Sequence, residues 1–579
     1  MATDLVDKSK IAATANVAFG DKVSNLSLQT GAGLLLSISV TYVMAAIWLI
    51  AGQSLEPIAS RALLIGGMLI SISLPILYAP RTGLSAAVLT ILLYFASVLL
   101  SSQLYDTSID GQHYHFQAIY ALASGWNPFH GSYQMPAELA PLPAIPWVIY
   151  YPKASWIVAA VQLSSGLSFE ATKAENFIMF FASFFSLAGA LLRLKLSFLL
   201  SSIAALAGAA NAVALAQLFT HMNDGLLGES ILLFITFAVL WLALRDSRAL
   251  IGACAAMIFA LNLKFSAAPI FLGLCAFVCV AWIIQCGAKA GLRALLVLGL
   301  VYMAAIAILG YAPYVTNLLA YGHPLYPLMG ANSIDLIGSN MPEVLRPMSG
   351  IQRFLFSLFS ETNSGYGYGN VPHLKVPFWI VPGEIRHSGG IDVRLAGFGP
   401  LFSGAITIAL ISLLAVLTAQ KRAPMVSSIL LVGAAVSVLV LLFPENWWAR
   451  YVPQLWIVPA AIGIAAALTT SPYIVWAGWA IILVLLVDST IVMGATAKLG
   501  AQRHVAVTEQ IRQMRNEGAR SCVFFDLAQS RIVLFRQAAL VITPLANPAD
   551  ATCSKLQPLA GYGPDRVGGQ ICRCESRDN

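Results

Sequence analysis

The chain has 579 residues, of which 58% are hydrophobic and only 10% are charged, far below the charged fraction of roughly 25% found in soluble domains. This composition excludes an ordinary soluble enzyme and predicts a polytopic membrane protein. Because Lys and Arg in such proteins mainly report orientation, the formal net charge of +7 does not predict a nucleic-acid partner.

Residues 1–30 lack a short apolar core followed by a small-residue cleavage site, so we expect a retained cytoplasmic segment rather than a signal peptide. Residues 31–494 are expected to form an all-α transmembrane domain. A membrane-spanning helix needs about 20 mostly apolar residues, and this length predicts about thirteen such helices. They are expected to begin near Gly31, Ala62, Ser85, Asn176, Ser197, Leu226, Ala249, Ala267, Ala294, Gly397, Met425, Val452 and Ile474.

The basic residues between these segments predict the orientation. With the N-terminus in the cytoplasm, the short basic connections all lie there as well, as the positive-inside rule requires. These connections carry Arg81, Arg193, Arg245, Lys289 and Lys421. The same assignment places residues 103–175, 314–395 and 495–579 outside an inner (plasma) membrane.

The first large outer loop, residues 103–175, contains two short apolar stretches. Gln112–Ser124 places Phe116, Ile119 and Tyr120 at helical spacing, and Ala154–Ser165 is only about 18 Å long as a helix. We expect both to be helices lying at the outer membrane interface. The alternative is an ordinary loop helix that packs on the bundle.

The remaining outer segments differ in character. Residues 314–395 are rich in glycine and aromatic residues, as in SGYGYGN, and are expected to form a mobile cover over a pocket. Residues 495–579 combine a polar helical run with strand-like SCVFFD and predict a small α/β domain. An oxidising compartment would permit disulfides there, among Cys522, Cys553, Cys572 and Cys574. No phosphate-binding glycine motif is present, so no nucleotide cofactor is expected.

Two acidic sites fall at the same predicted membrane face. Asp110 lies in IDGQHYH, where a carboxylate can act as a general base or bind a divalent cation. Asp224 lies in HMND with His221 and Asn223, and can bind a metal or orient an acceptor. For both aspartates the alternative is helix capping, which Ser108 could also provide in the first segment.

Basic side chains near that face suit an anionic phosphate. Lys264 ends a short apolar segment, and Arg450 follows two tryptophans in PENWWARYV. Lys153 begins the second interfacial stretch. The alternatives are snorkelling for Lys264, an interfacial anchor for Arg450 and, for Arg394, a structural pair with Asp392.

In this arrangement the chain resembles the GT-C superfamily of membrane glycosyltransferases, which includes protein O-mannosyltransferases and lipid A aminoarabinose transferases. The resemblance rests on IDGQHYH and YYPKASW in the first outer loop, HMND two crossings later, Arg450 near the last crossings and an outer C-terminal domain. Family members usually place the acidic loop after their first crossing, whereas an extra hairpin precedes it here.

The resemblance implies a sugar donor linked to polyprenyl phosphate and an extracytoplasmic acceptor that is a glycan, a lipid or a protein. Asp110 would then deprotonate the acceptor and Asp224 would assist, with inversion at the anomeric carbon. Family members differ in metal dependence, and a Mg²⁺ or Mn²⁺ ion would be held by Asp110, Asp224 and His221. Substrate contacts would come from His113, His115, Lys153, His221, Asn223, Lys264, Arg394 and Arg450.

Two other functions also fit a chain of this kind. A flippase or transporter would use many crossings, although transporter sites usually lie near the bilayer midplane and come with inverted repeats, and no such repeat is evident. An O-antigen ligase or polymerase would also use a large outer loop and arginines, but need not depend on Asp110.

Overall fold

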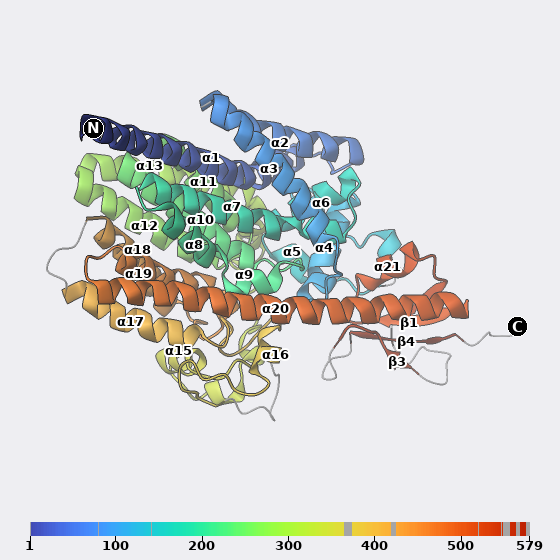
Figure 1. Cartoon of the computed structure of the whole chain (residues 1–579). Helices are drawn as coiled ribbons and strands as arrows, with labels where there is room; N and C mark the ends of the chain where they lie inside the picture. The colour runs from blue at the N-terminus through green and yellow to red at the C-terminus, as the bar shows by residue number, and fades with distance from the viewer. Residues whose placement is uncertain are drawn as a thin grey trace, which may run out of the picture.

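The computed structural model describes residues 2–78, 80–140, 142–363, 373–418, 424–518, 520–545, 547, 556–562 and 568–574. Most of these residues form a bundle of helices, and a small sheet lies beyond one end of the bundle (Figure 1). Helices are the expected form for such apolar segments, because a bilayer offers no hydrogen-bond partner to an open backbone.

Nine helices in the described part of the chain are long and apolar enough to cross a membrane. They are α1 (Ala2–Ile50), α2 (Pro57–Tyr78), α3 (Pro80–Ser101), α7 (Ala174–Arg193), α10 (Asp224–Leu244), α12 (Ala267–Cys286), α13 (Ala288–Ala304), α18 (Pro424–Leu442) and α20 (Pro472–Glu517). The other four predicted crossings fall on shorter helices, so a helix is present at every predicted position, while the number that cross stays a prediction. These shorter helices are α8 (Phe198–Ala209), α11 (Ser247–Leu261), α17 (Phe402–Thr418) and α19 (Ile457–Ala467).

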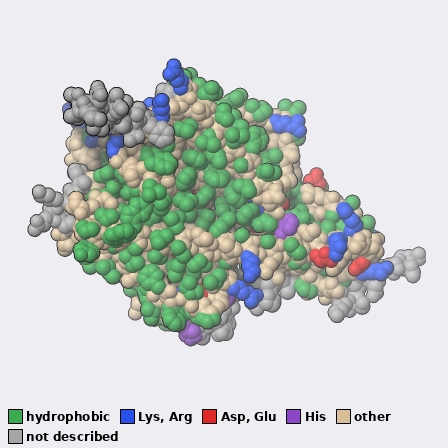
Figure 2. Space-filling view, viewed as in Figure 1, with side chains coloured by type: hydrophobic (Ala, Val, Ile, Leu, Met, Phe, Trp, Pro, Cys, Tyr) green, Lys and Arg blue, Asp and Glu red, His purple; other side chains and the backbone are tan. Residues whose placement is uncertain are grey.

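The exposure pattern of α3 is the reverse of that on a soluble helix. Leu92, Phe95 and Leu99 are largely exposed, whereas Thr90 and Ser97 are buried against neighbouring helices. Hydrophobic side chains likewise cover the broad middle of the bundle surface (Figure 2). An apolar outer surface of this extent is what lipid contact requires.

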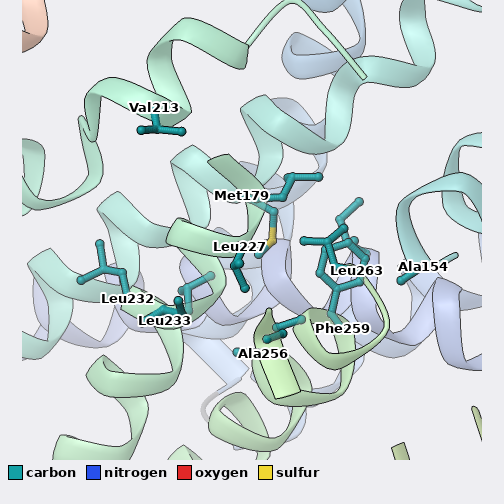
Figure 3. Packing of buried hydrophobic residues seen from close by; sticks show 14 of the residues in the cluster. Ala154, Met179, Val213, Leu227, Leu232, Leu233, Ala256, Phe259 and Leu263 are labelled. Atoms are coloured by element: carbon teal, nitrogen blue, oxygen red, sulfur yellow. The ribbon is translucent and has the colours of Figure 1, made fainter. Parts of the chain in front are cut away.

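Small residues allow the helices inside the bundle to approach closely. A Cβ atom on Gly31 of α1 would lie 2.3 Å from the Ser186 hydroxyl oxygen of α7, so this contact requires glycine. Farther along, Met179 of α7, Leu227 of α10 and Phe259 of α11 pack in one buried cluster (Figure 3). Together these contacts fix the relative positions of the helix ends.

The second short apolar stretch of the first outer loop is enclosed by protein. It forms α6 (Ala154–Ser165), in which every residue from Ala154 to Gln162 is buried, and it packs against α2 and α4 (Phe116–Ala123). The prediction that α6 lies at the membrane interface is therefore wrong, because an interfacial helix keeps one face open to lipid. The alternative, a loop helix packed on the bundle, is what the structure has.

Further short helices are α5 (Trp147–Tyr150), α9 (Ala212–Gln217), α14 (Thr316–Tyr321), α15 (Gly350–Leu358) and α16 (Glu384–Ser388).

The last long helix joins the bundle to the C-terminal sheet. α20 has 46 residues and continues without a break through position 494, where the sequence predicted the domain boundary. A helix of this length extends roughly 70 Å. It reaches from the bundle to the strands, so one continuous helix carries both parts (Figure 1).

The C-terminal part is α/β, as predicted. Its strands are β1 (Ser521–Phe525), β2 (Ile542–Leu545), β3 (Gln557–Pro558) and β4 (Gly569–Arg573), in the spatial order β2-β1-β4-β3. β1 is parallel to β2 and antiparallel to β4, and α21 (Arg531–Gln537) connects β1 to β2. A disulfide joins Cys522 to Cys574, whereas Cys553 and the whole of SGYGYGN (residues 364–370) lie outside the described residues.

Candidate functional site

Arg450 contacts three carboxylates that come from distant parts of the sequence. Its Nη2 lies 2.9 Å from Asp110, its Nε 3.0 Å from Asp224 and its Nη1 3.2 Å from Asp392. Asp110 precedes α4, Asp224 is the first residue of α10, Asp392 lies in the loop 314–395, and Arg450 lies between α18 and α19. The planar guanidinium holds all three because its nitrogens point in different directions.

Two more cations complete this arrangement. Lys264 forms an ion pair with Asp224, and Arg394 lies 3.3 Å from Asp392. We call the six side chains the charged cluster: Asp110, Asp224, Lys264, Asp392, Arg394 and Arg450. Its three positive and three negative charges balance, as buried charge requires.

The aromatic residues beside Arg450 form one wall of the charged cluster. The Arg394 guanidinium lies 4.0 Å from the centre of the Trp448 ring, and the Lys264 ammonium lies 4.3 Å from the centre of the Tyr451 ring. Trp447 and Trp448 are buried rather than placed at a lipid surface. The interfacial-anchor interpretation of Arg450 is therefore wrong.

The turn before α4 presents Asp110 with its carboxylate free of any capping bond. Asp106 accepts hydrogen bonds from the Ser108 backbone and hydroxyl, and Ser108 in turn accepts one from the Gly111 N–H. Asp110 makes no capping bond, so the capping alternative applies to Ser108 and not to Asp110. A Cβ on Gly111 would lie 2.1 Å from Asp106 Oδ2, so the turn requires glycine. A π-helical turn, Gly111–His115, follows, a feature that is frequent at functional sites.

The start of α10 is organised by Gln217 rather than by an aspartate cap. Gln217 donates to Asp224 Oδ2 at 3.0 Å and accepts from the Gly225 N–H at 2.8 Å. Asn223 donates to the Leu263 carbonyl at 3.0 Å, which holds the turn that carries Lys264 beside Asp224. Asn223 therefore supports the charged cluster from behind.

The charges determine which protonation states are favoured. Burial opposes ionisation of Asp110, but the Arg450 guanidinium outweighs it and holds the pKa of this carboxyl below its usual value. Burial also lowers the pKa of Arg394 to about 10, which still leaves it protonated at neutral pH. The Asp110 side chain is 27% exposed, so it is an ionised carboxylate that a substrate hydroxyl can approach.

The expected metal ligands do not come together. His221 Nδ1 lies 2.9 Å from Asp106, its Nε2 lies 3.0 Å from Thr172, and its ring stacks on Phe169. It is thus committed to a separate network, and the predicted set of Asp110, Asp224 and His221 is not assembled. Among the described residues, no group of three or more His, Cys, Asp or Glu side chains is placed to hold a metal ion.

Three other predicted contacts also lie outside the charged cluster. Lys153 donates to the carbonyls of Ile149 and Tyr151, at 2.9 and 2.8 Å, and burial lowers its pKa to about 7. His115 accepts from the Trp156 indole N–H at 2.5 Å, and burial lowers its pKa to about 4, so it is neutral. His113 is half-buried, and burial lowers its pKa as well.

Two members of this region did not stand out in the sequence as site residues. Asp392 was considered only as a partner of Arg394, and Gln217 was not considered. A carboxylate two residues before an arginine in a long outer loop was the available signal for Asp392. Gln217 gave no signal, because a glutamine in an apolar helix is equally typical of ordinary packing.

A separate cavity lies elsewhere, and its lining includes Arg193, Leu244 and Arg248. Asp224 and Leu244 are the two ends of α10, whose 21 residues extend about 30 Å. This cavity is therefore at the opposite end of the helices and is not part of the candidate site.

No family model matches the chain, and no curated protein matches it in sequence. Among solved structures, it is similar to the crystal structure of ArnT from Cupriavidus metallidurans bound to undecaprenyl phosphate. The match covers 79% of this chain and 86% of that chain, with 12% sequence identity and a TM-score of 0.41. What the site can do is therefore inferred from the residues of this chain.

Proposed function

We propose that the chain is an integral membrane glycosyltransferase that moves a sugar from a polyprenyl-phosphate donor to an acceptor on the extracytoplasmic side. The acceptor is an envelope glycan, a lipid or a protein. One observation carries the proposal: a single arginine contacts three carboxylates at one end of apolar helices, and two of these carboxylates, Asp110 and Asp392, are partly exposed. This arrangement supports the proposal because a carboxylate that could act as a base lies next to cations that suit a phosphate.

Asp110 is the proposed general base. As the acceptor hydroxyl oxygen bonds to the anomeric carbon, its proton passes to the Asp110 carboxylate. The bond between the anomeric carbon and the phosphate oxygen breaks, and the electron pair leaves with the polyprenyl phosphate. Attack from the side opposite the leaving group inverts the configuration.

Arg450 and Lys264 are the proposed contacts for the leaving phosphate, where negative charge develops. In the structure both cations face carboxylates, so an incoming phosphate must compete for them. If the phosphate accepts the hydrogen bond from Arg450 Nη2, Asp110 loses part of the positive charge that holds its pKa low. Donor binding would thus make Asp110 a stronger base when the sugar arrives.

A metal ion has no role in this scheme. Asp110 and Asp224 already face Arg450, Asp224 also faces Lys264, and His221 is bound to Asp106. A divalent cation there would meet two like charges within a few ångströms of its ligands, which disfavours binding. The residues present do not fit a divalent site, and no step is assigned to one.

The test combines glycan analysis with an assay in membranes. A deletion strain is complemented with wild type, Asp110→Asn or Asp335→Asn, and its membranes are supplied with polyprenyl-phosphate sugars. We expect wild type and Asp335→Asn to restore one envelope sugar and to transfer it, and Asp110→Asn to do neither at equal expression. Asp335 is the matched control because it is exposed and its Oδ1 accepts from the Gly338 N–H, which an asparagine oxygen can also do.

Two outcomes would contradict the proposal. Full transfer by Asp110→Asn would remove Asp110 as the base. Intact envelope glycans with lipid intermediates accumulated on the cytoplasmic side would instead indicate a flippase or transporter.

A further inference from the structure

Arg531 is buried where the C-terminal part meets the segment before α4. Its side chain is one of the largest fully enclosed in the described structure, and its Nε donates to Gln112 Oε1 at 3.0 Å. Its other two nitrogens, Nη1 and Nη2, are enclosed and form no hydrogen bond with any described residue. Because arginine stays protonated, these nitrogens carry N–H donors that have lost water without gaining a partner.

A second cation and a second enclosed donor lie beside Arg531. Arg503 of α20 reaches the Thr107 hydroxyl at 3.4 Å, and the Tyr562 hydroxyl is enclosed beside Gln112 without a full hydrogen bond to any described residue. Both arginines pass close to Gly561: a Cβ atom there would lie 3.0 Å from Arg531 Nη2 and 3.7 Å from the backbone carbonyl oxygen of Arg503. Neither arginine forms an ion pair with a carboxylate in the described part of the chain. We call Gln112, Arg503, Arg531 and Tyr562 the arginine site.

We propose that the arginine site binds a phosphate group. The two terminal nitrogens of Arg531 form a planar fork that matches two oxygens of an oxyanion, and the Tyr562 hydroxyl supplies a third donor. Arg503 supplies the second positive charge. Glu170 and Asp106 attract Arg531 electrostatically, but their ion-pair partners are Lys173 and His221. A phosphate would add negative charge beside the two arginines and pair the orphaned donors, which a neutral ligand would not do.

The arginine site is coupled to the candidate active site through Gln112, which lies two residues after Asp110. The Gln112 carbonyl accepts from the Ser530 N–H at 3.1 Å, and its side chain accepts from Arg531. An anion bound by Arg531 therefore acts on the turn that presents Asp110. Since the donors are enclosed, entry requires the C-terminal part and this turn to separate, and binding is expected to be slow.

Binding can be measured on the purified full-length protein in detergent, without any activity assay. The thermal unfolding midpoint is followed as inorganic phosphate replaces chloride at constant ionic strength. We expect a saturable rise for wild type and at least a tenfold weaker apparent affinity for Arg531→Gln. Arg512→Gln is the matched control, because Arg512 lies on α20 but is exposed and paired with Glu509; it should behave as wild type.

A second variant keeps the test decisive if Arg531→Gln does not fold. Tyr562→Phe removes only the hydroxyl and is expected to weaken phosphate binding several-fold. If phosphate does not raise the unfolding midpoint of wild type, the proposal is overturned. It is also overturned if Tyr562→Phe and Arg531→Gln both bind phosphate with the affinity of wild type. If Arg531→Gln is unfolded, an unchanged affinity in Tyr562→Phe is sufficient to overturn it.

A further pair of ligands distinguishes the source of the phosphate. Glycerol 3-phosphate represents a phosphate carried by an acceptor, and inorganic phosphate represents the free ion. Binding of the ester at least tenfold more tightly would indicate a substrate headgroup, and equal or tighter binding of the inorganic ion would indicate a free anion. Because stability is the readout, the result is independent of whether glycosyl transfer is the activity.

Discussion

Replacing Arg450 by lysine tests whether the geometry of this cation matters in addition to its charge. In the structure three different nitrogens of Arg450 contact Asp110, Asp224 and Asp392 at 2.9, 3.0 and 3.2 Å. Lysine keeps the positive charge but carries it on one nitrogen, which cannot occupy all three positions. Arg450→Lys should therefore retain the fold and lose much of the activity.

The size of each effect follows from burial. Loss of one positioned donor to a developing oxyanion costs about 3 kcal/mol, or roughly 100-fold in kcat. The stability cost should be smaller, about 1–3 kcal/mol, because Asp110 and Asp392 are partly exposed and Asp224 keeps Lys264 and Gln217.

The assay is the initial rate of sugar transfer from a polyprenyl-phosphate donor in lipid nanodiscs, with thermal unfolding of the same preparations. Arg346→Lys serves as the control, since Arg346 is exposed in the loop 314–395. A kcat for Arg450→Lys within a factor of three of wild type would refute the reasoning, because charge alone would then be sufficient.

Three further predictions concern the support of the site. In Gly111→Ala the new Cβ would lie 2.1 Å from Asp106 Oδ2, so the turn must shift, and transfer should fall at least tenfold while expression is unchanged. Burial lowers the pKa of His115 from 6.5 to about 4 in the folded protein. Between pH 4 and 6.5 the unfolded chain therefore binds more protons than the folded protein. Stability should fall by about 3 kcal/mol as the pH drops from about 6.5 to 4, and a pH series of unfolding should show this loss in wild type but not in His115→Gln. Lys264→Met leaves the buried carboxylate of Asp224 with less compensating charge, so it should destabilise the protein by about 3 kcal/mol. Unfolding by denaturing detergent measures this loss. An unchanged unfolding midpoint would show that Lys264 is not the effective partner of Asp224.

Most of the helix positions could be predicted from the sequence because apolar length is a local property. A run of about 20 apolar residues forms a helix wherever lipid surrounds it, since the backbone has no other hydrogen-bond partners. Local composition also located the α/β C-terminal part and the cysteines of the Cys522–Cys574 disulfide. It failed for α6, because whether protein or lipid covers a short apolar helix depends on neighbours that are distant in sequence.

The sequence by itself determined which residue types were available to the site. Asp110, Asp224, Lys264 and Arg450 stood out because ionisable groups are costly in so apolar a chain. Only the tertiary structure decided their partners. In the charged cluster the fold brings Arg450 to three carboxylates, and the turn before α4 commits His221 to Asp106.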